Sequence, residues 1–206
     1  IGQTRANTTE LPDNEKMHSV RVIVLHQDGT VEHNRHFSLE SAQTQKTILL
    51  KVTPNETKKI FLFANEESVS AVKGTVGVNR TLTDFFNSYT ENMSDFANAV
   101  NNLYFAPDYS NGKPIPMSSM YEIDFPENGN FNGTFYVVRV ATKFTYRFKN
   151  FRSDAVTVNS ISVSEIADNS YLMVHKQNQT MQFTEEDNSI SDLFWIDWLK
   201  KVSDES

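Results

Sequence analysis

The sequence contains no cysteine, which excludes thiol catalysis, thiolate zinc sites, cysteine-ligated iron–sulfur clusters and any disulfide framework. It also contains no apolar run near the roughly 18 residues that a membrane-spanning helix requires. The phosphate-binding patterns G-x-G-x-x-G and G-x-x-x-x-G-K-[ST] are missing, as is the nucleophile elbow G-x-S-x-G. Acidic residues outnumber basic ones, and the net charge of -7 argues against nucleic acid or an anionic membrane surface as the main partner.

Apolar residues are abundant enough for a sizeable core. The chain has 206 residues, of which 38% are hydrophobic, and this length fits one large domain or one domain and the start of another. Residues 1–16 are polar and predict a flexible leader or linker. We expect one folded domain over 17–175, and over 176–206 a linker with the start of a second domain or a C-terminal extension.

Alternating apolar residues predict β-strands. Val20, Val22 and Val24 give one apolar face to a strand over 18–26. Asp28-Gly29 predicts a tight turn into a polar return strand over 31–37, which we expect at a sheet edge. Similar patterns predict further strands over 47–52, 58–64, 121–125, 134–148, 155–166 and 170–175.

One segment follows a helical period instead. Apolar residues recur every three or four positions over 82–105, with Thr81 or Thr83 as the N-cap and Ser94-Asp95 as a break between two short helices. About eight short strands without a parallel strand–helix–strand rhythm predict a mainly β protein, an antiparallel β-sandwich with this helical insertion. The residues expected to be buried between its two sheets are Val20, Val22, Val24, Ile60, Leu62, Val138, Val140, Phe144, Val156, Ile161 and Val163.

Candidate metal-binding and catalytic residues are few. His33 and His36 are three residues apart, which on a strand places them on opposite faces, so we expect solvated edge histidines. The acidic run over 185–187 lacks the alternating oxygen ligands and the glycine of a calcium loop, and it predicts a solvated loop. We therefore expect no metal, no cofactor and no enzymatic activity, and a hydrolase of unknown type is the least favoured interpretation.

The aromatic residues leave two interpretations open. One is a platform for sugars, because flat rings pack against the apolar faces of pyranoses. Such a platform would make the protein a carbohydrate-binding β-sandwich of a surface glycan-capture system. The interpretation that we favour is that the rings of the helical segment fill the core, and that both tryptophans face an adjoining domain. The rings concerned are Tyr104, Phe105, Tyr109, Trp195 and Trp198.

Several short segments occur in a characteristic order. Thr4-Arg5-Ala6 precedes a polar stretch and a valine-rich strand that ends in Asp28-Gly29. The later segments are 60–65 (IFLFAN), 115–118 (IPMS), 138–144 (VRVATKF) and the strand pair 160–166 and 169–173. Together they resemble the fimbrillins of Bacteroidetes, the FimA-like subunits of type V pili. The resemblance covers most of residues 4–175, although the family's R-x-x-A-K strand has here an extra residue between Ala141 and Lys143.

This resemblance implies a transthyretin-like β-sandwich that is exported as a lipoprotein precursor to the outer membrane and the cell surface. It implies that a trypsin-like protease cleaves between Arg5 and Ala6, and that another fimbrial subunit then adds a strand to the exposed groove. Family members usually have a second domain whose C-terminal segment donates this strand, whereas residues 190–206 resemble the opening of a second domain. We therefore expect a structural and adhesive fimbrial subunit, present here as an N-terminal fragment or as a short variant.

Overall fold

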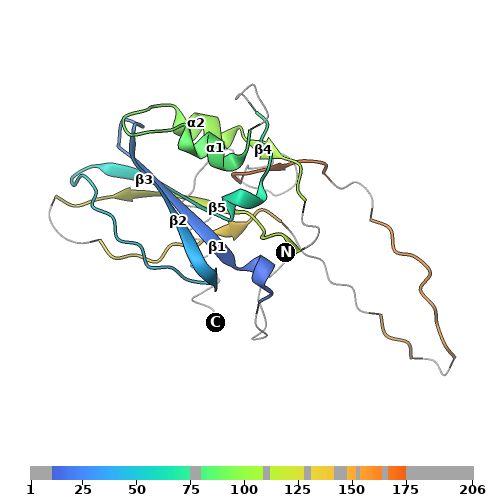
Figure 1. Ribbon diagram of the computed structural model, residues 1–206. Helices are drawn as coiled ribbons and strands as arrows, with labels where there is room; N and C mark the ends of the chain where they lie inside the picture. Colours follow the sequence, from blue (N-terminus) through green and yellow to red (C-terminus); the bar gives the residue numbers. More distant parts are fainter. Residues whose placement is uncertain are drawn as a thin grey trace, which may run out of the picture.

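The main sheet of the computed structural model has five antiparallel strands in the order β2-β1-β3-β5-β6, and a smaller sheet pairs β4 with β7 (Figure 1). The structure describes residues 11–74, 80–108, 112–127, 131–141, 148–151, 154–163 and 167–174. The strands are β1 (Met17–Leu25), β2 (Val31–Gln43), β3 (Thr57–Ala64), β4 (Tyr104–Phe105), β5 (Met117–Asp124), β6 (Val138–Arg139) and β7 (Ser170–Tyr171). The helical elements are the 3-10 turns η1 (Asp13–Glu15) and η2 (Glu66–Ser68) and the α-helices α1 (Leu82–Asn87) and α2 (Phe96–Asn101). The predicted mainly β fold is confirmed, and its arrangement is consistent with a β-sandwich.

The β1–β2 hairpin forms where the sequence predicts it. Gly29 has a φ of 88°, a left-handed value that glycine adopts without steric cost. The His26 N–H donates to the Thr30 carbonyl at 2.8 Å and closes the turn. The return strand β2 is the outermost strand of the sheet, as predicted, although it extends to Gln43.

The two faces of the main sheet are covered differently. Side chains of β1 and β3 alternate between these faces. The helices α1 and α2 lie over one of them (Figure 1), where the ring centroids of Phe63 and Phe86 are 4.4 Å apart. The buried residues of this helix-side core are Ile23, Leu25, Val31, Phe61, Phe63, Val69, Val72, Leu82, Phe85, Phe86, Phe96, Ala99, Val100, Leu103, Phe105, Leu172 and Met173.

The opposite face of the sheet carries a second group of buried residues, the loop-side core. Half-buried side chains from 48–52 and 135–137 pack against it. The five residues of β1 and β3 whose burial the sequence predicts all belong to this group, so their burial is confirmed, although irregular segments of the described chain and not a second sheet cover them. The members of the loop-side core are Met17, Val20, Val22, Val24, Ile60, Leu62, Ala64, Met117 and Tyr121.

The helical insertion contains two short helices, as its sequence predicts. The Thr81 hydroxyl accepts a hydrogen bond from the Asp84 N–H at 3.0 Å and caps α1. Asp95 has a φ of 71° and precedes α2, so a left-handed residue separates the helices at the predicted break. No helix in the described ranges has the length and apolar character needed to cross a membrane.

The strand predicted over 47–52 is wrong, because this segment forms no ladder in the structure. Its apolar side chains are nevertheless half-buried against the loop-side core. Side chains of β2 bond its backbone instead of a neighbouring strand. The His33 Nε2 donates to the Lys51 carbonyl at 2.7 Å, and the Thr53 N–H donates to the Glu32 carboxylate at 2.5 Å.

The long strand predicted over 134–148 is wrong for most of its described residues, because only the two residues of β6 form a ladder. A side chain replaces the ladder at Tyr136. The Tyr121 hydroxyl donates to the Tyr136 carbonyl at 2.7 Å and accepts from the Tyr136 N–H at 2.6 Å. Val138 and Val140 are half-buried, and the predicted core residue Phe144 lies outside the described residues.

Residues 154–163 form an arm that projects from the sheet (Figure 1). The strand predicted over 155–166 is wrong for residues 155–163, which have no regular secondary structure. The predicted core residues Val156, Ile161 and Val163 are each more than half exposed, because none of the described strands pairs with the arm. The strand predicted over 170–175 is confirmed only in its first two residues, as β7.

Candidate functional site

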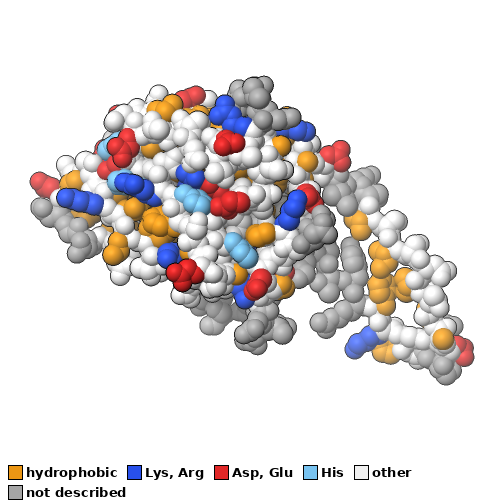
Figure 2. Space-filling view, viewed as in Figure 1, with side chains coloured by type: hydrophobic (Ala, Val, Ile, Leu, Met, Phe, Trp, Pro, Cys, Tyr) orange, Lys and Arg blue, Asp and Glu red, His pale blue; other side chains and the backbone are white. Residues whose placement is uncertain are grey.

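The β2 edge of the main sheet is rich in charge. Its only outward backbone pairing in the described ranges joins Val31 to Asn92 and Met93 in the turn after α1. Histidine, acidic and basic side chains are interspersed over this region in the space-filling view (Figure 2). Charged side chains on an edge strand discourage the addition of a further strand, so β2 is a protected edge. The charged and imidazole residues of β2 are Glu32, His33, Arg35, His36 and Glu40.

Among the residues that the structure describes, no strand covers most of the β5 edge. Strand β6 pairs with only the first two residues of β5. The Pro116 carbonyl accepts a hydrogen bond from the Val140 N–H at 2.9 Å, so even-numbered residues of β5 direct their N–H and C=O groups toward this edge. Within the described ranges no strand pairs with Met120 or Glu122 on this side. The backbone there can accept a further strand.

An aromatic cluster adjoins the end of β5. The ring centroids of Tyr121 and Phe135 are 4.8 Å apart, and those of Phe125 and Phe131 are 5.2 Å apart. The Phe131 and Phe135 rings lie 6.1 Å apart and nearly parallel. A Cβ on Gly133 would lie 2.7 Å from Cε1 of Phe131, so the lack of a side chain at Gly133 leaves space for this ring. This cluster was not predicted, although the alternation of phenylalanine and glycine over 131–135 is visible in the sequence.

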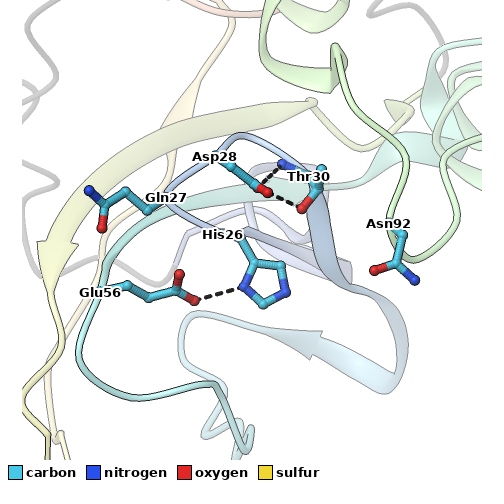
Figure 3. A pocket seen from close by; sticks show the side chains of 6 residues that line it. All are labelled: His26, Gln27, Asp28, Thr30, Glu56 and Asn92. Carbon is cyan, nitrogen blue, oxygen red and sulfur yellow. Dashed lines mark hydrogen bonds and ion pairs between the residues drawn. The ribbon is translucent and has the colours of Figure 1, made fainter.

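An open hollow of about 590 Å³ lies beside the β1–β2 hairpin (Figure 3). The Nδ1 atom of His26 lies 2.7 Å from Oε1 of Glu56. Asp28 accepts hydrogen bonds from both the N–H and the hydroxyl of Thr30. The carboxylates that face the hollow are therefore already bonded by their neighbours. The residues that line it are His26, Gln27, Asp28, Thr30, Glu56 and Asn92.

Lys58, which is fully buried, is a cation shared by three side chains near the hollow. Its Nζ lies 2.6 Å from Oε2 of Glu32 and 3.2 Å from Nδ1 of His26, and it also contacts Oε1 of Glu56. The Lys58 hydrogen bond lowers the pKa of Glu56. Burial raises the pKa of Glu32, but hydrogen bonds from Lys58 and Thr53 more than offset it, so the pKa of Glu32 is lowered as well.

The donor atoms of His26, Glu32 and Glu56 are close enough together to hold a metal ion. The ammonium group of Lys58 lies within contact distance of all three. A metal ion would have to displace this buried, ion-paired lysine, which would leave an uncompensated charge. We therefore assign the group a structural role, with Lys58 as its internal cation.

The donor atoms of His36, Glu66 and Glu67 form a second such group, next to a buried ion pair. Arg21 is 4% exposed and Glu66 is 1% exposed. The Arg21 Nε and Nη2 atoms donate to the two carboxylate oxygens of Glu66 at 2.6 and 2.7 Å. The guanidinium carbon also lies 5.4 Å from the ring centroid of Phe86 in α1. Both carboxylate oxygens of Glu66 are thus bonded to Arg21. The ion pair joins β1 to the helix layer, which consists of η2, α1 and α2.

The two histidines of β2 lie on opposite faces of the sheet, as their spacing predicts. The Nε2 atom of His36 lies 2.7 Å from Oε1 of Glu67, on the helix side of the sheet. His33 bonds instead the carbonyl of Lys51, in the segment that covers the loop side. The Asn34 amide donates to carbonyls at the end of α1, so β2 is tied to both layers.

Most other residues that the sequence singles out fall outside the described residues. Of the predicted sugar-stacking rings, Phe105 is buried in the helix-side core and Tyr104 is half-buried beside Tyr171, with 6.0 Å between ring centroids. These two positions favour the core interpretation of the aromatic residues. The predicted residues that the structure leaves undescribed are Arg5, Ala6, Tyr109, Trp195, Trp198 and the acidic run 185–187.

No family model, no curated protein and no solved structure matches this chain. The functional conclusions therefore depend on the edges of the main sheet, on the side chains around them and on the resemblance noted in the sequence.

Proposed function

We propose that the protein is a structural and adhesive subunit of a cell-surface fimbrium, made as a lipid-anchored precursor at the outer membrane. In this proposal a trypsin-like protease cleaves after Arg5, and subunits then join by strand addition in a transthyretin-like sandwich. The observation that supports it most directly is that one sheet combines a protected β2 edge with an open β5 edge.

The β5 edge offers both backbone and side-chain contacts to an incoming strand. Met120 and Glu122 direct N–H and C=O groups outward that pair with no strand of the described residues, and an added strand would pair with them. Ile123 and Phe125 are half-buried at the rim of the loop-side core, and the same strand would cover them. Main-chain pairing would thus supply affinity and the apolar rim would supply specificity.

The β2 edge makes such assembly directional. Its charged side chains disfavour strand addition, and His36 and Asn34 fix it to the helix layer. A subunit with one accepting edge and one protected edge forms heterologous contacts, which produce open filaments when the rotation between subunits does not close.

Cleavage-dependent assembly is the first test of this proposal. The exported precursor would be treated with a trypsin-like protease, and its mass followed by light scattering. We expect oligomers that continue to grow after cleavage, and no such growth for the Arg5→Ala precursor under the same treatment. Complete cleavage at Arg5 without any growth in the mass of the wild-type protein would contradict the proposal.

The accepting edge is tested by a backbone substitution. Glu122→Pro removes an N–H group that faces the open edge and leaves the ladder to β3 intact. We expect this variant to keep the far-ultraviolet circular dichroism of the wild type and to lose assembly after cleavage. Glu122→Ala removes the same charge, keeps the N–H group and should assemble normally. Equal assembly of both variants would exclude β5 as the accepting edge.

A further inference from the structure

The arm of residues 154–163 has an apolar pattern that the described part of its own chain leaves uncovered. Val156, Val158, Ile161 and Val163 are each at least half exposed. Figure 2 shows hydrophobic side chains along this projection. β-Branched residues at such density are typical of strands that pack against another surface. A pattern that predicts burial, on a segment that is exposed, indicates that the arm is buried by another molecule.

We propose that this arm pairs with the open β5 edge of a second copy of the chain, so that two copies exchange arms. Arm and edge each lack a strand partner in the described ranges, and Figure 1 shows both following an extended course. The arm spans about 30 Å and the six open residues of β5 about 20 Å, so one arm is long enough to cover the edge. The arm extends away from its own sheet in Figure 1, which favours the edge of another copy.

The side chains in the first part of the arm, residues 156–158, match those of the edge in their alternation. Val156 and Val158 point to one side of an extended chain. Placed beside β5, they would continue the row of Tyr121 and Ile123 over the loop-side core. Thr157 would then lie on the other side of the sheet, on the same side as Glu122, so the polar side chains of arm and edge would be neighbours.

Arm exchange differs from the proposed fimbrial assembly in two measurable ways. It needs no cleavage at Arg5, and because it is reciprocal it closes at two copies. Strand addition after cleavage has an open end and continues to grow. A dimer in uncleaved protein therefore tests the arm, and growth after cleavage tests the fimbrial proposal. Each can fail without the other.

The test uses the absence of cysteine in the wild-type chain. One chain carries Thr157→Cys, and a second, enlarged by a tag, carries Glu122→Cys; the two are mixed and mildly oxidised. We expect a reducible disulfide between tagged and untagged chains. The control replaces the second chain by one with Glu40→Cys, on the β2 edge. We expect roughly tenfold less mixed disulfide there, because only the β5 contact holds the two thiols at millimolar effective concentration.

The mass of the uncleaved protein supplies a second readout. We expect a dimer that dissociates on dilution, and a monomer for the double variant Val156→Asp, Val158→Asp. Both residues are exposed in the single chain, so the variant should keep its circular dichroism and thermal transition. The proposal is overturned by a wild-type chain that stays monomeric at high concentration, or by equal cross-linking to the Glu40→Cys control.

Discussion

The helix-side and loop-side faces of the main sheet are built on the same strands, yet they differ in how completely they are buried. Leu25 faces α1 and α2 and is 0% exposed, whereas Leu62 faces the irregular segments and is 9% exposed. Helices bring regular rows of side chains to one face, and the segments 47–52 and 131–137 bring half-buried ones to the other. Among the described residues, the helix-side face is thus fully covered, whereas the loop-side face has only half-buried residues at its rim beside β5.

The largest effect that we expect comes from the ion pair beneath the helix layer. Glu66→Ala leaves the buried Arg21 guanidinium without its carboxylate, which should cost about 4 kcal/mol of the free energy of unfolding. The control is Glu67→Ala, because Glu67 is its direct neighbour but is 52% exposed; it loses the hydrogen bond from the Ser19 hydroxyl, and about 1 kcal/mol is expected there. Urea unfolding measures both. Equal losses would mean that burial of the pair does not matter.

A matched leucine pair compares the two faces directly. Leu25→Ala should reduce the free energy of unfolding by about 3 kcal/mol, and Leu62→Ala by about 2 kcal/mol. The loss is larger at Leu25 because the cavity left there is tightly enclosed, and its walls cannot collapse to fill it. Urea denaturation with a common m-value gives the two differences. A loss at Leu62 that exceeds the loss at Leu25 would reverse the comparison of the faces.

Two glycines extend the comparison to the backbone. Gly74 has a φ of 141°, and a Cβ there would lie 2.6 Å from the Asn102 carbonyl oxygen, so Gly74→Ala should cost about 2 kcal/mol. At Gly133 the added Cβ meets the far end of the Phe131 ring, which can shift, so Gly133→Ala should cost about 0.5 kcal/mol. Thermal unfolding measures both variants, and near-ultraviolet circular dichroism should detect the ring shift in the second.

The smallest effect that we expect is a loss of stability at low pH, caused by the carboxylates at the hairpin end of the sheet. The pKa values of Glu32 and Glu56 are lowered below the ordinary 4.5, so both are stabilising above that pH. This stability should decline as the pH falls below about 4.5 through their lowered pKa values. Urea unfolding at pH 7 and pH 4 measures the decline, and Glu56→Gln should show a smaller one. If Glu56→Gln lost as much stability as the wild type between pH 7 and pH 4, Glu56 would not contribute to this decline.

Much of the fold follows from local patterns in the sequence. The β1–β2 hairpin, the strand β3 and the broken helical insertion are predicted because turn residues, alternation and helical period agree there. The irregular backbone of segments 47–52 and 131–137 is not predicted. Alternation indicates which side chains face a core, but it does not indicate whether the backbone pairs with another strand. In the arm, the same alternation predicts burial that the described chain does not supply.

The candidate sites were harder to predict than the fold. The Arg21 and Glu66 side chains that join β1 to the helix layer are 45 positions apart, and no local pattern connects them. The open edge at Glu122 depends on the strand order, because the same residues would be covered if β6 continued along β5. The two histidines of β2 are the exception, since their separation follows from strand geometry alone.

Both helices lie in the connection between β3 and β5, although these strands are neighbours in the sheet. The β1–β2 hairpin closes through a short turn, whereas the β3–β5 ladder must enclose residues 65–116. In the course of folding we therefore expect the hairpin to form early and β5 to dock late, which φ-values at Val22 and Tyr121 would measure. The edge assigned to assembly is then the last part of the sheet to appear, so a chain cannot recruit partners through it before its own core is closed.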